Sequence, residues 1–232
     1  MIPKKIHYVW VGGREKPADI ERCMKTWRTN LKGYEIIEWN EENFDMNMNE
    51  YIKVAYEQKK WAYVSDYIRA YVIYNEGGIY LDTDVLVLDN LDQFLDNRAF
   101  VGFENPQYPF TAAFGAEPKH PFVKDMLDFF EGESFTFDRE NQMKNVNTKT
   151  VSDILIDKYH CQLGNKEQIL DEGIHVYPSG ILCNPSGDSS TIHVFTGTWM
   201  EGQKPLKRKL NKWFKIRTTS KKKAKLYQKL FG

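Results

Sequence analysis

The segment 75–85, which reads NEGGIYLDTDV, places the strongest constraint on how this chain folds. Gly77 and Gly78 end a helical pattern, because glycine readily takes the left-handed backbone that closes a helix. The apolar run after them is short enough to be a buried strand, and it leads into Asp82 and Asp84. Residues two apart in extended backbone point to the same side, so both carboxylates face one place. Since Mg²⁺ and Mn²⁺ commonly bind one or two protein carboxylates together with substrate phosphates, the segment predicts a divalent-cation site at the end of a strand.

Strand and helix patterns continue on both sides of this segment. Hydrophobic periodicity predicts strands at 6–11, 34–39, 79–81, 100–103, 111–114, 174–177 and 192–195, and helices at 17–30, 49–58, 60–75, 121–130 and 150–159. The polar stretch 131–149 is predicted to be a loop. Strands that alternate with helices over the first half of the chain predict an α/β sheet.

The helix predicted at 60–75 carries a charged pair. Asp66 and Arg69 are three residues apart, so they are neighbours on the helix surface. They fall on a different face from the apolar stripe of this helix, so the core is expected to tolerate their loss. From the residues alone, the pair is a solvated ion pair of little energetic weight.

Composition limits the class of protein. The 232 residues suffice for one sizeable domain, or for a domain with an appendage. No apolar run approaches the length that a bilayer requires, and the first residues lack the apolar region of a signal peptide. Cys23, Cys161 and Cys183 are scattered and form no C-x-x-C pair, which predicts reduced thiols in a cytoplasmic protein.

The net charge of zero hides a strong asymmetry. Residues 202–232 hold 12 lysines and arginines and no acidic residue. Subtracting these from the 32 basic residues of the chain leaves 20 in the segment 1–201, against 32 acidic ones. A main domain at 1–201 with a charge of −12 therefore carries a tail at 202–232 with a charge of +12, which suggests that the tail has an anionic partner of its own.

The tail also has an amphipathic pattern. Apolar residues fall at helical spacing in two stripes, and lysines surround them: the stripes are Leu206, Leu210 and Trp213, then Leu226, Tyr227, Leu230 and Phe231. We expect a helical tail that lies on an anionic membrane surface without spanning it. The alternatives are a solvated helical hairpin, a nucleic-acid patch and a clamp on the acidic body; no nucleic-acid partner is expected.

Several ordered blocks together resemble glycosyltransferases with a DXD sugar-binding region, the group of yeast initiating mannosyltransferases, bacterial capsule transferases and clostridial glucosylating toxins. The resemblance covers roughly residues 2–200. It rests on segments 2–10, 62–69, 77–84 and 192–199 and on the pair His120-Pro121.

The resemblance implies a GT-A type fold, in which a mixed nucleotide-sugar-binding sheet has flanking helices. It implies retention of anomeric configuration, a UDP-sugar as the expected donor, and Mn²⁺ or Mg²⁺ as the cofactor. The expected reaction transfers a hexose to a lipid-linked saccharide acceptor. It would be a step in the synthesis of a surface or capsular polysaccharide. The expected location is the inner face of the cell membrane, with the protein bound peripherally.

The resemblance also implies roles for particular residues. Trp10 would stack on the nucleotide base, and Asp66 and Arg69 would bind the donor sugar and phosphate. Asp82 would contact ribose and sugar, and Asp84 would ligate the metal. The residue types agree with these roles, because a diphosphate leaving group gains negative charge that a metal and an arginine stabilise.

Three further residues near the end of the main domain match family positions. His193 lies where the family places a second metal ligand, Thr198 would add an oxygen, and Trp199 would donate its indole N–H to the leaving diphosphate. Without the resemblance, Trp10 would be read as a core residue, and His193 is as readily a strand histidine as a ligand.

Two departures from the family pattern concern the donor sugar. An asparagine that contacts the sugar in relatives is missing near 111–113, where Asn105 and Thr111 are the nearest substitutes. A Thr-Gly-Pro block is replaced at 147–150. The sequence therefore leaves the sugar open.

Two other functions are compatible with these residues. One is a metal-dependent nucleotidyltransferase or nucleotide-sugar hydrolase, which would use the same metal and diphosphate chemistry. The other is a non-catalytic carbohydrate-binding module.

Overall fold

The computed structural model describes residues 1–131, 135, 147–197 and 206–231. A mixed sheet of seven strands forms its centre, in the order β2-β1-β3-β6-β5-β8-β7. The strands are β1 (Lys5–Val9), β2 (Glu35–Trp39), β3 (Gly78–Leu81), β5 (Ala99–Gly102), β6 (Ala113–Ala116), β7 (Gln168–Ile169) and β8 (Ile174–Tyr177). A separate pair, β4 (Val85–Val87) and β9 (Thr191–His193), forms a small second sheet.

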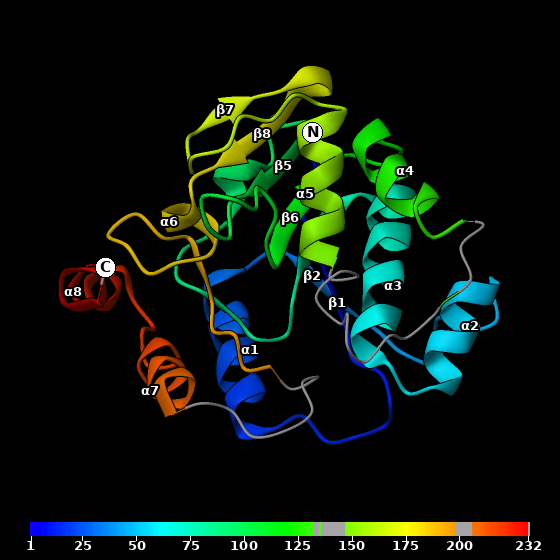
Figure 1. Ribbon diagram of the computed structural model, residues 1–232. Coiled ribbons are helices and arrows are strands. Elements are labelled where there is room, and N and C mark those ends of the chain that lie inside the picture. The colour runs from blue at the N-terminus through cyan, green and yellow to red at the C-terminus, as the bar shows by residue number, and fades with distance from the viewer. Residues whose placement is uncertain (132–134, 136–146, 198–205, 232) are drawn as a thin grey trace.

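Helices cover both faces of the large sheet (Figure 1). Helix α1 packs on one face, and α2, α3, α4 and α5 pack on the other. The helices are α1 (Ala18–Asn30), α2 (Glu50–Glu57), α3 (Trp61–Glu76), α4 (Pro121–Asp128), α5 (Asn147–Asp157), α6 (Ser179–Leu182), α7 (Leu206–Lys215) and α8 (Lys221–Phe231), with single 3₁₀ turns at Asp92–Phe94 and Asp171–Gly173.

Strand β1 shows how the sequence divides between the two faces. Ile6 and Tyr8 belong to the core under α1, whereas Val9 belongs to the core under α3. This is the period of two that extended backbone imposes. Since both faces are covered, all residues of β1 after Lys5 are buried, including His7.

Helix α3 ends where the glycine pair predicts. Gly77 has a φ of +66°, and its N–H donates to Ile73 O at 2.9 Å. A Cβ at Gly77 would lie 2.6 Å from the Pro118 ring, so both the backbone conformation and the space require glycine. The chain then turns directly into β3, which carries it to Asp82.

Four chain segments meet at one edge of the sheet. Strands β1, β3 and β5 run parallel to one another, and β6 runs antiparallel between β3 and β5. The carboxyl ends of β1, β3 and β5 therefore share an edge with the start of β6. Ligands of open α/β sheets bind at such edges.

The small sheet connects this edge to the C-terminal helices. Three apolar side chains pack against Ile216 and Ala224 of the tail: Leu86 of β4, Ile192 of β9 and Val194 just after β9. Helices α7 and α8 lie beside α1, at the end of the molecule away from α2 (Figure 1). The tail therefore contacts the body of the protein.

Most expected elements are present, with some differences. Strands β4 and β7 and helix α6 were not expected; each has four residues or fewer, which is too short for a periodic pattern. Helix α5 begins at Asn147, inside the stretch expected to be a loop. Within the described residues, no helix is both long and apolar enough to cross a membrane.

His7 is fixed as a neutral imidazole in the core. Its Nε2 lies 2.9 Å from Gly77 O, and its Nδ1 accepts a hydrogen bond from Trp39 Nε1 at 3.0 Å. A protonated Nδ1 would lose the bond from Trp39, and burial lowers the pKa of His7 to about 4. Acid therefore destabilises the folded state at this site.

We expect His7 to make stability fall as the pH drops from 6.5 to 4. The unfolded chain takes up a proton on His7 below pH 6.5, whereas the folded chain does so only near pH 4. Wild type should lose about 3 kcal/mol more than His7→Gln between pH 7 and pH 4, measured by urea unfolding. All other titrating groups are common to both proteins, so equal losses would contradict a neutral His7.

Candidate functional site

A tight turn presents the two aspartates. The N–H of Asp82 donates to Ala112 O at 2.9 Å and so extends the pairing of β3 with β6. The N–H of Val85 then donates to Asp82 O at 3.0 Å, which closes the turn into β4. The turn holds Asp82 and Asp84 at the edge where the parallel strands end.

Pairing of β4 with β9 brings His193 to this turn. Val85 is the register partner of His193, and Val194 N–H donates to Asp84 O at 3.1 Å. The imidazole Nε2 of His193 lies 3.3 Å from Asp84 Oδ1. Ligand atoms of Asp82, Asp84 and His193 all lie within 4.8 Å of one another. The structure thus brings together Asp84 and His193, two of the three residues expected to ligate the metal, and places Asp82, which was expected to contact ribose and sugar, beside them.

Asp84 is buried and strongly stabilised as a carboxylate. Burial alone would raise the pKa of Asp84, but His193 and two hydrogen bonds from Thr196 outweigh it and lower the pKa to about 2. Thr196 N and Oγ1 donate to Asp84 Oδ2 at 2.8 and 2.9 Å. Burial likewise opposes the charged form of His193, but Asp84 raises its pKa to about 10. Without a metal, the two side chains form an ion pair.

These residues fit a divalent cation. Two carboxylates and an imidazole form a donor set that suits Mn²⁺, and the carboxylates alone suit Mg²⁺. The second imidazole nitrogen of His193, Nδ1, is buried and makes no hydrogen bond to the residues that the structure describes. A metal on His193 would take the position of the proton that it shares with Asp84.

Arg69 and Asp66 lie beside the turn, and both are buried. The guanidinium is hydrogen-bonded to Asp66 and lies 3.6 Å from Asp82 Oδ1. It also packs 4.9 Å from the ring centre of Tyr80. The expectation that this helix face lies outside the core is wrong: only 7% of Asp66 and 8% of Arg69 is exposed, because α3 is covered on this side as well.

The electrostatic balance of this pair depends on its burial. Burial raises the pKa of Asp66 to about 6, although Arg69 acts in the opposite direction. Burial opposes the charge of Arg69, but Asp66 and Asp82 raise its pKa overall. Both groups are therefore mostly ionised at pH 7, and Arg69 links Asp66 to Asp82 of the candidate metal site.

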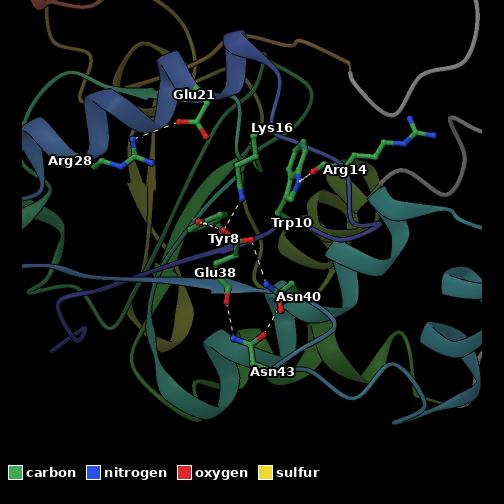
Figure 2. A network of polar contacts seen from close by, with 9 residues as sticks. All are labelled: Tyr8, Trp10, Arg14, Lys16, Glu21, Arg28, Glu38, Asn40 and Asn43. Carbon is green, nitrogen blue, oxygen red and sulfur yellow. Dashed lines mark hydrogen bonds and ion pairs between the residues drawn. The ribbon is translucent and has the colours of Figure 1, made fainter.

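Trp10 follows β1 at the same edge. Its indole Nε1 donates to Arg14 O at 2.7 Å, and Lys16 Nζ lies 5.5 Å from its ring centre. Figure 2 shows Trp10 beside Arg14, and Lys16 reaching toward Glu38, to which it donates at 2.8 Å. The ring is only partly buried. Stacking of Trp10 on a base remains a prediction.

Three polar residues that sequence reasoning did not assign also lie near these groups. Burial raises the pKa of the Glu104 carboxyl, which follows β5 and interacts with His193 and Asp82. Thr111, just before β6, has a buried hydroxyl that makes no hydrogen bond to any described residue. Asn147 lies close enough to Asp66 to lower its pKa, yet within the same part of the chain the polar atoms of its side-chain amide make no hydrogen bond of ordinary geometry.

Sequence reasoning therefore found the charged centre but missed part of its surroundings. Thr196 lies within a matched block, so its place beside Asp84 could have been suspected from that block. Glu104 and Asn147 carry no motif signal. Thr198 and Trp199, which the resemblance assigns to the metal and the leaving group, lie outside the described residues.

We expect Arg69→Met to destabilise the fold strongly. The change leaves Asp66 and Asp82 without their shared cation, and breaking a buried ion pair typically costs about 3–5 kcal/mol. Urea unfolding at pH 7 measures the cost. Arg98→Met is the matched control, because Arg98 is half exposed and pairs with Glu117 and Glu172 at the surface. Its cost should be about 0–1 kcal/mol, and equal costs for the two variants would contradict the burial of Arg69.

Comparison with known proteins relates part of this chain to glycosyltransferases. Residues 17–101 match a family model described as glycosyltransferase sugar-binding region containing DXD motif. An uncharacterised glycosyltransferase of Acanthamoeba polyphaga mimivirus is 28% identical over 167 residues, which are 68% of this chain and 64% of that protein. Inositol phosphoceramide mannosyltransferase 3 of Schizosaccharomyces pombe is 31% identical over 134 residues, 54% of this chain and 36% of that protein. The chain thus aligns with less than two thirds of the length of either relative.

A solved structure, the PaToxG glycosyltransferase, superimposes with a TM-score of 0.52 at 17% identity, covering 68% of this chain and 69% of that one. With the seven-stranded mixed sheet between helices, this likeness confirms the expected GT-A type fold. The matched segment contains Asp66, Arg69, Asp82 and Asp84. Over this segment the chain is therefore similar to glycosyltransferases whose sugar-binding region contains a DXD motif.

Proposed function

We propose that this protein is a metal-dependent glycosyltransferase that transfers a hexose from a UDP-sugar donor to a saccharide acceptor. The observation that carries the proposal is the cluster of Asp82, Asp84 and His193, with buried Arg69 beside it, at the ligand-binding edge of the sheet. Carboxylates and imidazole supply metal ligands, and arginine supplies a fixed cation. A diphosphate needs both.

In this proposal, Asp84 and His193 hold Mn²⁺ or Mg²⁺, and Thr198 adds an oxygen ligand. Asp82, which lies beside them, contacts the ribose and the sugar of the donor. When bound, the cation would neutralise the diphosphate as the glycosidic bond breaks. Thr196 fixes the Asp84 carboxylate through two hydrogen bonds, so this ligand is oriented before any metal arrives.

The remaining residues bind and orient the donor. Arg69 places a positive charge that can stabilise the departing diphosphate, and Trp199 is proposed to donate its N–H there. Asp66 accepts hydrogen bonds from sugar hydroxyls. The unpartnered buried polar atoms of Thr111 and Asn147 support a hydroxylated ligand here, because such atoms are costly to leave without hydrogen bonds. We propose retention of configuration from the family resemblance and assign no catalytic base.

Two other functions share this chemistry. A nucleotide-sugar hydrolase or nucleotidyltransferase would use the same metal and diphosphate contacts. A carbohydrate-binding module would need no buried cation such as Arg69. Release of UDP that depends on an acceptor glycan identifies a transferase, and release by water alone identifies a hydrolase.

We predict that Asp84→Asn abolishes metal-dependent donor binding. A thermal-shift screen of nucleotide sugars with Mn²⁺ should find a donor that stabilises wild type by about 2.7 kcal/mol at 100 times its Kd. Asparagine is nearly isosteric and can still accept a bond from Thr196, so the variant should fold. It loses the negative charge that the metal requires.

Asp128→Asn is the matched control, because Asp128 is exposed on α4 and pairs only with Lys124 at the surface. It should bind donor as wild type does. Full donor-induced stabilisation of Asp84→Asn, or of wild type in excess EDTA, would contradict the metal assignment.

We further propose that the tail docks on an anionic membrane at the inner face of the cell membrane, where a lipid-linked acceptor in surface or capsular polysaccharide synthesis would lie. Six large apolar side chains of α7 and α8 are exposed: Leu210, Trp213, Phe214, Leu226, Leu230 and Phe231. Rings of the two helices touch, with the centres of Phe214 and Phe231 at 4.9 Å. Apolar groups ringed by lysines are typical of helices that lie in a membrane interface.

Two other observations bear on the tail. Lys212 pairs with Asp19, and Lys221 with Asp89, both at 2.6 Å, so part of its charge contacts the acidic body. The exposed Lys222 and Lys223 make no ion pair among the described residues and remain able to meet anionic lipid. The Schizosaccharomyces pombe relatives are named for transfer to inositol phosphoceramide, a lipid acceptor, which supports this placement.

Removing apolar contact from the tail should release the protein from vesicles. Leu226→Asn with Leu230→Asn changes side chains that are 57% and 65% exposed, so the fold should be unaffected. We expect at least tenfold weaker flotation with anionic liposomes, since fully burying one leucine contributes about 1.5–3 kcal/mol. Leu163→Asn is the control, because Leu163 is 48% exposed outside the tail. Equal flotation of both variants, or equal binding to anionic and neutral lipid, would rule out tail docking.

A further inference from the structure

Lys215, the last residue of α7, is a buried cation. Only 4% of it is exposed. Its Nζ lies 3.2 Å from His193 O and 3.3 Å from Asn184 Oδ1, and 4.5 Å from the ring centre of Phe195. Among the described residues, no carboxylate oxygen lies within 4.0 Å of this ammonium. The contacts are therefore with neutral groups alone.

The fold of the tail dictates this position. Ile216, the next residue, is buried against Ile192 and Val194 on either side of His193. Thr218 is buried one turn later. The end of α7 is therefore anchored on β9, which holds Lys215 beside His193.

A buried lysine with no ion pair is uncommon, because its desolvation is not repaid. Burial lowers the pKa of Lys215, and the more distant carboxylates of Glu104 and Asp84 offset this only in part. Among the described residues, the polar groups in contact with this ammonium are a carbonyl and an amide oxygen, and no carboxylate pairs with it directly. The ammonium lies beside the main chain of a proposed metal ligand, where an anionic substrate would pair with it.

We propose that Lys215 is an anion-binding residue of the donor site, whose ammonium contacts a phosphoryl oxygen of the bound nucleoside diphosphate. The inference rests on the proposed function. It makes α7 part of the donor site in addition to its proposed role at a membrane. The cation would act on the diphosphate from the tail side, while Arg69 acts from α3.

A purely structural role is the alternative, in which Lys215 only holds the His193 carbonyl in place. Two substitutions in the full chain separate the roles. Lys215→Gln keeps a hydrogen-bond donor for His193 O but has no charge, and Lys215→Arg keeps the charge. Lys223→Gln is the control, because Lys223 is exposed on α8.

The probes are Mn²⁺ alone, followed by electron paramagnetic resonance, and inorganic pyrophosphate with Mg²⁺, followed by calorimetry. We expect Lys215→Gln to weaken pyrophosphate binding at least tenfold while Mn²⁺ binding stays within twofold of wild type. Lys215→Arg and Lys223→Gln should bind pyrophosphate within threefold of wild type. A structural role would instead weaken the binding of both probes together.

Asn184→Asp provides a second route that keeps the lysine. The new carboxylate would lie 3.3 Å from Nζ and would neutralise the cation in place. Asn184→Asp should therefore weaken pyrophosphate binding as Lys215→Gln does. It provides the test in case Lys215→Gln does not fold. Unchanged pyrophosphate binding in the neutralised variants, or a parallel loss of Mn²⁺ binding, would overturn the assignment of Lys215. Failure of wild type to bind either probe would instead overturn the proposed metal–diphosphate site, and Lys215 with it.

Discussion

The pairing of β4 with β9 is the interaction on which the candidate site depends. It sets His193 opposite Val85 and so brings an imidazole from late in the chain against Asp84. The same small sheet carries Ile192, which packs on Ile216 of the tail. One short ladder of hydrogen bonds therefore positions the expected metal ligands and anchors the C-terminal helices beside them. Any change that weakens this ladder would be felt at the site and in the tail together.

The charges around the ladder follow a simple electrostatic pattern. Arg69 is balanced by Asp66 and Asp82, and Asp84 is balanced by His193 and Thr196. Within the described part of the chain, Lys215 contacts neutral groups. Without ligand, the His193 proton stands where a divalent cation would bind. In the proposed function, metal and diphosphate together would exchange that proton for a metal ion and give Lys215 an anion.

Local signals in the sequence predicted much of this arrangement. The glycine pair, the apolar run and the two aspartates define α3, β3 and the turn, because each depends on neighbours in the chain. The burial of Arg69 was not foreseen, since it depends on helices from other parts of the chain. Lys215 stands in a run of lysines that look alike in sequence, and only the anchoring of Ile216 distinguishes it. Short strands such as β4 lack the length that a period requires.

The central claim is that Asp84 and His193 hold a divalent cation against a diphosphate. A crystal structure of the protein soaked with Mn²⁺ and UDP, with anomalous data collected at the manganese edge, tests it most directly. The account predicts one strong anomalous peak within bonding distance of Asp84 and His193, with the diphosphate on its open side. A peak bound elsewhere, or UDP in this site with no manganese between its phosphates and Asp84, would contradict it.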